Sequence, residues 1–186
     1  MNIIAVDETN RLFHIRNAVP EEYATELAHL DWNAIAWQRQ PYQESWKRRM
    51  LDKDHPSLAK LNPLIEKSIF KLNRACGVKF MFASTTWWLD EPDFTVSIHT
   101  DGGLAAAIQL FWVMPSEEFG TTFYNSKDSA DIRFQPKSVP NSGYIMLNLP
   151  DKDGIQPLQW HGMLNPVPAD TIRVTSYTSF VTYENK

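Results

Sequence analysis

The feature that most constrains the fold is the residue pattern in the second half of the chain. This pattern predicts short strands with no helical stretch between them. From Gly77 onward, runs rich in Val, Ile, Thr, Phe, Tyr and Trp are separated by Pro, Gly, Asn and Asp. The strands predicted from these runs are 79–89, 94–99, 105–113, 121–124, 131–134, 143–148, 157–161 and 171–182. This density of strands predicts a double-sheet β-fold, a sandwich or jelly roll, rather than a parallel α/β sheet.

Two helical signals precede the strands. The first begins near Pro20, which suits the first turn of a helix, and places Tyr23, Leu27 and Leu30 at helical spacing. The second runs from about Ser57 to Cys76 and is closed by Gly77 as a C-cap. We therefore predict an α+β fold in which N-terminal helices pack against one sheet of a β-core.

The length of 186 residues fits one domain with a sizeable core. We expect residues 1–186 to form that domain, with a helical part over about 18–77 and a β-core over about 79–183. The single cysteine, Cys76, excludes an intrachain disulfide and a thiolate metal cluster, so a metal would rest on histidines and carboxylates.

The net charge of −4 and a pI near 5.7 give no electrostatic footprint for nucleic acid or an anionic membrane. The basic run Lys47–Arg49 is interpreted as a solvated face, and the acidic cluster of Asp90, Glu91 and Asp93 as a solvated loop. No apolar stretch approaches the length of a membrane span, and the N-terminus lacks a secretory signal. A cytoplasmic protein without nucleic-acid or membrane partners is expected, and its oligomeric state stays open.

Among the histidines, His99 is distinguished by its neighbours. The segment 95–103 reads as an extended chain running into a Gly-Gly turn, so His99 and Asp101 share one face. An imidazole and a carboxylate that point the same way can hold one ion. His-x-Asp alone is a common tripeptide, so a metal site here requires a further ligand from elsewhere in the chain.

The rest of the constellation lies further along. His161 follows Trp160 at the end of a short strand, and Arg173 comes twelve residues later. Alternation places Arg173 and Thr175 on the same strand face, where a buried guanidinium needs an anionic partner. Two histidines and one carboxylate are the ligand set of non-haem Fe(II) sites with open positions. A 2-oxoacid can occupy two of those positions, with Arg173 and Thr175 holding its far carboxylate.

This order of residues resembles the 2-oxoglutarate/Fe(II)-dependent oxygenase superfamily. It reads His99-Thr-Asp101, distant His161, then Arg173-Val-Thr175. Supporting segments are 119–124, 136–147 and 13–23, so the resemblance covers most of the chain. The resemblance implies a double-stranded β-helix with the metal at one mouth of the barrel. It also implies Fe(II) held by His99, Asp101 and His161, and 2-oxoglutarate held by Arg173.

The implied reaction is hydroxylation of a peptidyl side chain or a small metabolite, with release of succinate and CO2. Two alternatives stay open: an iron oxidase of the same fold that does not use 2-oxoglutarate, and a catalytically inactive binding module. Three further residues on candidate strands, Gln109, Phe111 and Asn148, are candidates for contact with co-substrate or substrate. Most of the tryptophans are expected to pack in the core.

Overall fold

The computed structural model describes most of the chain in one β-rich fold. The residues described are 1–7, 11–35, 37–38, 47–51, 59–60, 63–64, 79–149, 154 and 158–182. The second predicted helix, 57–76, lies almost wholly outside the described residues. Among the residues that the structure describes, no helix has the length and apolar character to cross a bilayer.

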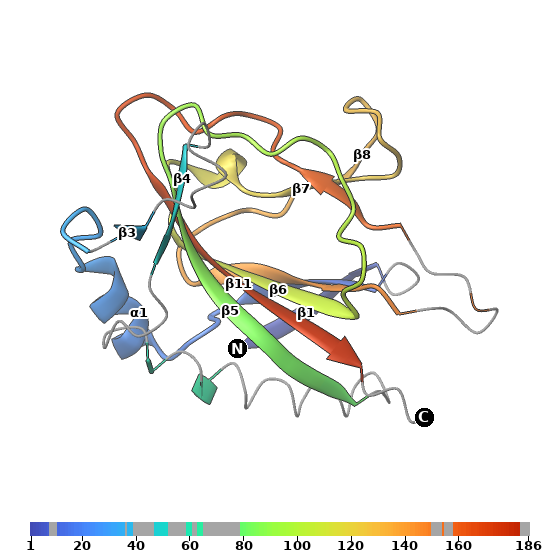
Figure 1. The fold of residues 1–186 in the computed structure, drawn as a ribbon, viewed down its shortest axis with the longest axis horizontal. Helices are drawn as coiled ribbons and strands as arrows, with labels where there is room; N and C mark the ends of the chain where they lie inside the picture. Colours follow the sequence, from blue (N-terminus) through green and yellow to red (C-terminus); the bar gives the residue numbers. More distant parts are fainter. Residues whose placement is uncertain are drawn as a thin grey trace.

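Two antiparallel sheets make up the fold (Figure 1). The large sheet has the order β1-β2-β9-β6-β11-β5-β4-β3. Its strands, in chain order, are β1 (Asn2–Asp7), β2 (Leu12–Arg16), β3 (Trp37–Gln38), β4 (Arg48–Leu51), β5 (Phe80–Asp90), β6 (Ala106–Val113), β9 (Ser142–Leu147) and β11 (Arg173–Thr182). The small sheet has the order β10-β7-β8. Its strands are β7 (Thr122–Tyr124), β8 (Ile132–Phe134) and β10 (Trp160–Gly162).

The central strands β6 and β9 of the large sheet are buried on both faces, which is why apolar residues predominate in both. One face carries the main hydrophobic cluster, in which side chains from β5, β6, β9 and β11 pack with those of α1 (Glu21–Ala28). Trp32, Trp87 and Trp112 stack in this cluster, with ring centroids 5.7 and 5.3 Å apart. The opposite face of the large sheet packs against the small sheet. A smaller hydrophobic cluster, which includes Phe111 and Phe123, lies between the two sheets.

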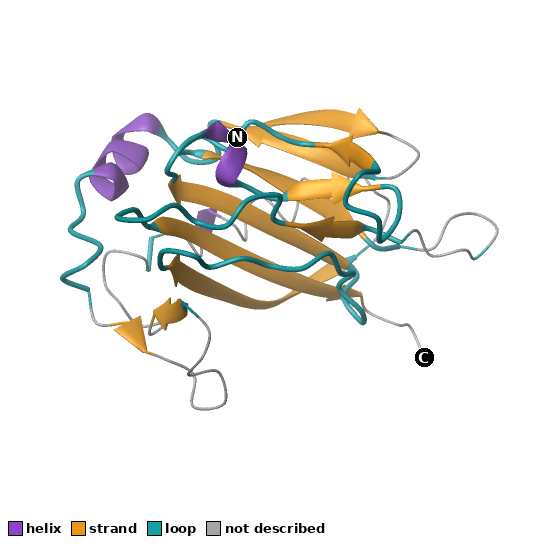
Figure 2. Cartoon of the chain, turned by 90° about the horizontal axis from the view of Figure 1, so that it is seen from above, coloured by secondary structure: helices purple, strands orange, loops and turns teal. Residues whose placement is uncertain are grey.

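Helix α1 confirms the first helical prediction. It begins after Pro20, has Glu21 and Glu22 in its first turn, and buries Tyr23 and Leu27. Both glutamates are favourable at the positive end of the helix dipole. Figure 2 shows α1 beside one end of the large sheet. Among the described residues of the N-terminal part, α1 is the only helix longer than two residues. The expectation of several packed helices is therefore not confirmed.

Most of the predicted strands are present within a residue or two of their expected ends. One prediction was wrong: residues 94–99 do not form a regular strand. Their backbone runs antiparallel to 161–167, but the hydrogen bonds are irregularly spaced and only the pair His99–His161 forms a bridge. The hairpin of β1 and β2 was not predicted from the sequence, although it extends the large sheet by two strands.

Candidate metal and anion site

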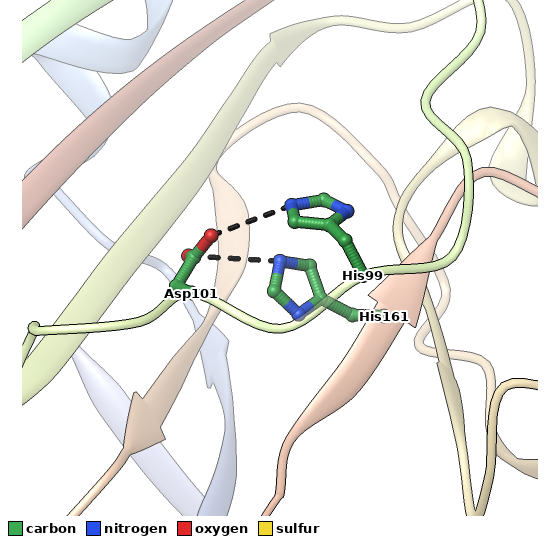
Figure 3. A group of neighbouring side chains, drawn as sticks. All are labelled: His99, Asp101 and His161. Atoms are coloured by element: carbon green, nitrogen blue, oxygen red, sulfur yellow. Dashed lines mark ion pairs between the residues drawn. The ribbon is translucent and has the colours of Figure 1, made fainter.

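Three predicted ligands, His99, Asp101 and His161, converge between the two sheets. Their potential ligand atoms all lie within 4.8 Å of one another. The Nε2 atom of His99 is 3.3 Å from Oδ1 of Asp101, and Nε2 of His161 is 3.6 Å from Oδ2 of the same carboxylate. Figure 3 shows the two rings and the carboxylate directed toward one another. This spacing allows the three side chains to bind one ion.

The backbone brings the two histidines together. His99 and His161 exchange two N–H···O bonds of 2.9 Å, and their ring centroids are 4.4 Å apart. Next to this bridge, Gly162 lies against the extended segment: a Cβ there would stand 2.9 Å from the carbonyl oxygen of Val96 and 3.1 Å from Cα of Ile98. A larger residue would push this segment away, so Gly162 permits the approach that places His99 beside His161.

Each histidine is oriented by its second ring nitrogen. Nδ1 of His99 donates to the Ser97 carbonyl and Nδ1 of His161 to the Gln159 carbonyl, both at 2.8 Å. With Nδ1 protonated, the Nε2 lone pair is directed to the other two side chains. A backbone carbonyl behind the ring is a usual arrangement for metal-binding histidines, because it fixes the tautomer and the ring orientation. The donor set therefore fits a divalent metal.

Electrostatics favour the metal-binding protonation state at two of the three candidate ligands. Burial lowers the pKa of His161 below its ordinary value, despite the opposing influence of Asp101, so this ring is neutral near pH 7. Burial alone would raise the pKa of Asp101, but hydrogen bonds and charges from the histidines, with Tyr177, bring it below its ordinary value. The hydrogen bond to Asp101 raises the pKa of His99, so a proton competes with a metal there.

Tyr177 of β11 holds the Asp101 carboxylate in place. Its hydroxyl donates to Oδ2 of Asp101. Burial, followed by the nearby Asp101 charge, raises the pKa of this phenol, so it remains a donor. Asn148, one of the strand residues suggested from the sequence, contributes to the same loop, since its side-chain amide donates to the Asp101 carbonyl at 3.4 Å. Two residues thus fix the turn that carries Asp101.

A cavity of about 240 Å³ contains this group of three side chains and reaches Arg173. Its lining combines the candidate ligands with aromatic, polar and cationic side chains. The polar and charged members besides the candidate ligands are Arg48, Gln109, Thr121, Tyr144, Arg173 and Tyr177. A small polar molecule in the cavity would therefore meet the candidate ligands and two cations together.

Arg173 is buried and has an anionic partner within the protein. Its side chain is 1% exposed, and its Nε and Nη2 atoms lie 2.7 and 2.6 Å from Oδ2 of Asp90. A hydrogen bond also runs from Nη1 to the Phe119 carbonyl at 3.1 Å. Asp90 also binds Arg48, whose Nε lies 2.5 Å from Oδ1. The cluster of Arg48, Asp90 and Arg173 therefore carries two positive charges and one negative charge.

A network of neutral groups adjoins the cation cluster. Gln109 accepts hydrogen bonds from Thr121 at 2.8 Å and Tyr144 at 2.7 Å. Its amide nitrogen donates to the Thr175 hydroxyl at 3.4 Å. Thr175 is fully buried behind Gln109 and is not among the residues that line the cavity. Of the other strand residues suggested from the sequence, Gln109 lines the cavity, whereas Phe111 packs in the core.

Three interpretations of charged residues were wrong. The side chains of Arg48 and Glu91 are 14% and 15% exposed and that of Asp90 is fully buried, whereas all three were predicted to be solvated. Arg48 and Asp90 each lie at the end of a strand beside the cavity, because β4, β5 and β11 are in register there. Asp90 continues the alternation of β5 on the face of Trp88, and this pattern in the sequence could have revealed its burial. Asp93, by contrast, is exposed as expected.

Comparisons with known proteins identify the fold. Neither protein-family models nor curated proteins match the sequence, whereas solved structures do. A viral collagen prolyl hydroxylase from Paramecium bursaria Chlorella virus-1, in complex with 2-oxoglutarate, matches with a TM-score of 0.62 at 11% identity, over 97% of this chain and 100% of the other. A Pseudomonas putida prolyl-4-hydroxylase matches with a TM-score of 0.65 at 11% identity, over 94% of each chain.

A third similar structure is HygX from Streptomyces hygroscopicus, with nickel, 2-oxoglutarate and hygromycin B bound. Its TM-score is 0.66 at 7% identity, over 95% of this chain and 84% of the other. These likenesses show that the chain has the jelly-roll-like fold of 2-oxoglutarate-dependent oxygenases. The expectation of that fold, which the sequence resemblance implied, is confirmed.

Proposed function

We propose that the protein is an Fe(II)- and 2-oxoglutarate-dependent dioxygenase that hydroxylates a peptidyl side chain or a small metabolite. The observation that carries this proposal is one cavity lined both by His99, Asp101 and His161 and by a buried cluster of net positive charge. The fold, which other 2-oxoglutarate-binding proteins share, supports it. Succinate and CO2 would be released with the oxidised product.

His99, Asp101 and His161 would hold the iron. Two neutral imidazoles and one carboxylate suit Fe(II), and this ligand set leaves coordination positions for other molecules. Bound Fe(II) would supply the redox chemistry that couples decarboxylation of 2-oxoglutarate by O2 to insertion of an oxygen atom into a C–H bond. The protein's own contribution is orientation, through the carbonyls behind both rings and the Tyr177 hydroxyl on Asp101.

The cation cluster would bind the distal carboxylate of 2-oxoglutarate. Arg173 would make the principal contact, because it lines the cavity and is held by Asp90 and the Phe119 carbonyl. Thr175, predicted to assist, would act by orienting Gln109, to which it is hydrogen-bonded. In an oxidase that does not use 2-oxoglutarate, the same cluster would instead bind a carboxylate of the substrate. Binding measurements with 2-oxoglutarate separate the two activities.

The substrate would approach through a second, larger cavity of about 640 Å³. We call it the outer cavity, and the cavity of about 240 Å³ the inner cavity. The walls of the outer cavity include residues of the extended segment before His99, and it shares Arg48, Val96 and His99 with the inner cavity. The remaining lining residues are Lys47, Asp93, Phe94, Thr95 and Ser97. Lys47 and Asp93 form an exposed ion pair at 2.6 Å, so their charges compensate each other, and Arg48 is the charged residue where this cavity meets the inner one.

Replacement of Arg173 tests the co-substrate assignment. Arg173→Ala is expected to weaken 2-oxoglutarate by about 2 to 4 kcal/mol, since a buried carboxylate loses its charged partner. Asp90 keeps Arg48 as a counter-ion, so the variant retains a balanced pair. Anaerobic calorimetric titration of the Fe(II)-loaded protein measures the change. Arg49→Ala, which alters a half-exposed arginine outside both cavities, is the control. Unchanged affinity in Arg173→Ala would remove this residue from the site.

Tyr177→Phe tests the support of the metal ligand. Without the hydroxyl, Asp101 loses a hydrogen bond that fixes its orientation, and Fe(II) affinity is expected to fall by roughly 10- to 100-fold. Competition with a chromophoric chelator under argon gives the dissociation constant. Tyr124→Phe is the matched control, because this buried tyrosine belongs to the small sheet and does not line the cavity. Equal metal affinity in wild type and Tyr177→Phe would show that the hydrogen bond is irrelevant to binding.

A further inference from the structure

We propose that Arg48 is a specificity-determining residue that makes this site select a 2-oxo dicarboxylate over a 2-oxo monocarboxylate. The inference rests on the proposed function and extends it to a residue outside the predicted ligand set. It derives from the way in which one carboxylate, Asp90, is shared between two guanidinium groups.

The sharing is built into the register of three neighbouring strands. Asp90 at the end of β5 lies opposite Arg48 of β4 on one side and Arg173 of β11 on the other. Arg48 binds both carboxylate oxygens, at 2.5 and 3.2 Å, while Arg173 binds Oδ2 through two nitrogens. The three charges therefore alternate in a row across the sheet, and both cations line the inner cavity.

Charge balance explains why the second arginine matters. Arg173 and Asp90 alone would form a neutral buried pair, which would attract a further carboxylate only weakly. Arg48 adds a positive charge, so the cluster has a net charge of +1 where the local dielectric is low and charges interact strongly. A site of this kind is completed by one additional anion, which the distal carboxylate of 2-oxoglutarate supplies. A methyl group in the same place would leave the excess charge unbalanced.

Hydrogen-bond donors are available for that anion. A guanidinium has five N–H groups. Arg173 donates one hydrogen bond to Asp90 and one to Phe119, and its Nη2 is in ion-pair contact with Asp90, which leaves at least two N–H groups. Arg48 donates two hydrogen bonds to Asp90 and retains three N–H groups. Within the described part of the chain these remaining donors have no hydrogen-bond acceptor, and they belong to side chains that line the cavity.

Aromatic rings hold Arg48 at the cavity. Its guanidinium carbon lies 4.2 Å from the ring centroid of Phe94 and 4.8 Å from that of Trp88. Cation–π contacts of this length favour the charged group in the place where it lies. Arg48 also lines the outer cavity, so it lies between the proposed binding sites of the co-substrate and the substrate. Its position is thus fixed by contacts other than the bond to Asp90.

The test compares two ligands of the same chain length. 2-Oxoglutarate and 2-oxopentanoate differ only at the distal carbon, which is a carboxylate in the first and a methyl group in the second. Each is titrated anaerobically into the Fe(II)-loaded wild type, Arg48→Gln and the control Arg49→Gln. Arg49 is the adjacent residue of the same strand and pairs with Glu91 outside both cavities.

Arg48→Gln is expected to weaken 2-oxoglutarate by at least about 10-fold, the effect of one charged contact at a partly buried site. Binding of 2-oxopentanoate should stay within about twofold of the wild type, since this ligand has no distal charge for Arg48 to bind. Arg49→Gln should match the wild type for both. Arg48→Lys, which keeps the charge, should retain most of the preference for 2-oxoglutarate.

Three results would overturn the inference. Unchanged 2-oxoglutarate binding in Arg48→Gln would show that Arg48 is only a counter-ion for Asp90. An equal loss for both ligands would show a general structural defect rather than selectivity. A loss in Arg48→Lys as large as that in Arg48→Gln would contradict the role of charge. If the wild type bound neither ligand, the proposed function itself would fail, and this outcome is distinct from all three.

Discussion

Asp101→Ala is expected to abolish tight Fe(II) binding. The variant removes the one anionic member of the proposed ligand set and leaves two imidazoles without the carboxylate that their Nε2 atoms face. Loss of a group that only orients a ligand already costs roughly 10- to 100-fold in metal affinity, so loss of the ligand itself should cost more than about 100-fold. Equilibrium dialysis under argon, with iron measured by elemental analysis, gives the affinity.

Asp128→Ala is the control for this variant. It removes an exposed carboxylate from the loop between β7 and β8, away from the cavity, and should bind iron as the wild type does. Thermal melting of both apo-proteins checks the fold, because Asp101 bonds with Tyr177 besides its contacts with the histidines. Stoichiometric, tight iron binding by folded Asp101→Ala would rule out the proposed ligand set.

The second large effect is on stability, in Asp90→Asn. This change leaves two guanidinium groups side by side, of which Arg173 is almost wholly buried, without the carboxylate that both of them bind. Breaking a buried ion pair by removing one partner typically costs about 3 to 5 kcal/mol. For a chain of this size, that corresponds to a lowering of Tm on the order of 10 °C. Urea unfolding followed by tryptophan fluorescence measures the free energy directly.

Asp93→Asn is the matched control for Asp90→Asn. Asp93 pairs with Lys47, and the two side chains are 71% and 51% exposed, so solvent screens this pair. Its loss should cost less than about 1 kcal/mol. Equal destabilisation of the two variants would contradict the special role of the Arg48, Asp90 and Arg173 cluster.

The pH dependence of stability depends on the pKa of Asp90. Burial by itself raises this pKa, but the charges of Arg173 and Arg48 and their hydrogen bonds outweigh burial and lower it. A lowered folded-state pKa contributes stability that is fully present above the unfolded value of about 3.9 and is lost as the pH falls through the folded value. The difference in unfolding free energy between wild type and Asp90→Asn should therefore persist from neutral pH down to about 4 and shrink in stronger acid.

The strand-rich architecture and the convergence of the candidate ligands could be predicted from the sequence. Alternation along β11 placed Arg173 and Thr175 on one face, because side chains in a strand have a strict period of two. His99 and Asp101 do share one direction, although the segment before them is irregular rather than a strand. For this segment the prediction that the two side chains share one direction was right, although the strand from which it was derived is not present.

The internal partner of Arg173 was harder to predict. Burial of an arginine requires an anion, and from the sequence alone the co-substrate was the only anion expected there. Asp90 lies 83 residues before Arg173 and Arg48 lies earlier still, and only the pairing of β4, β5 and β11 brings the three together. A cluster of charged residues in the sequence usually indicates solvated surface and contains no information on strand pairing. Arg48 and Asp90 were therefore both assigned to the surface.

Anaerobic addition of Fe(II) and then 2-oxoglutarate to the purified protein tests the proposed function most directly. A 2-oxoacid that chelates Fe(II) would give a weak charge-transfer absorption band in the visible range if His99, Asp101 and His161 hold the iron as proposed. We expect this band in the wild type and in Asp128→Ala, and its loss in Asp101→Ala. A folded, iron-loaded wild-type protein that gives no band at saturating 2-oxoglutarate would contradict the proposed co-substrate and with it the proposed activity.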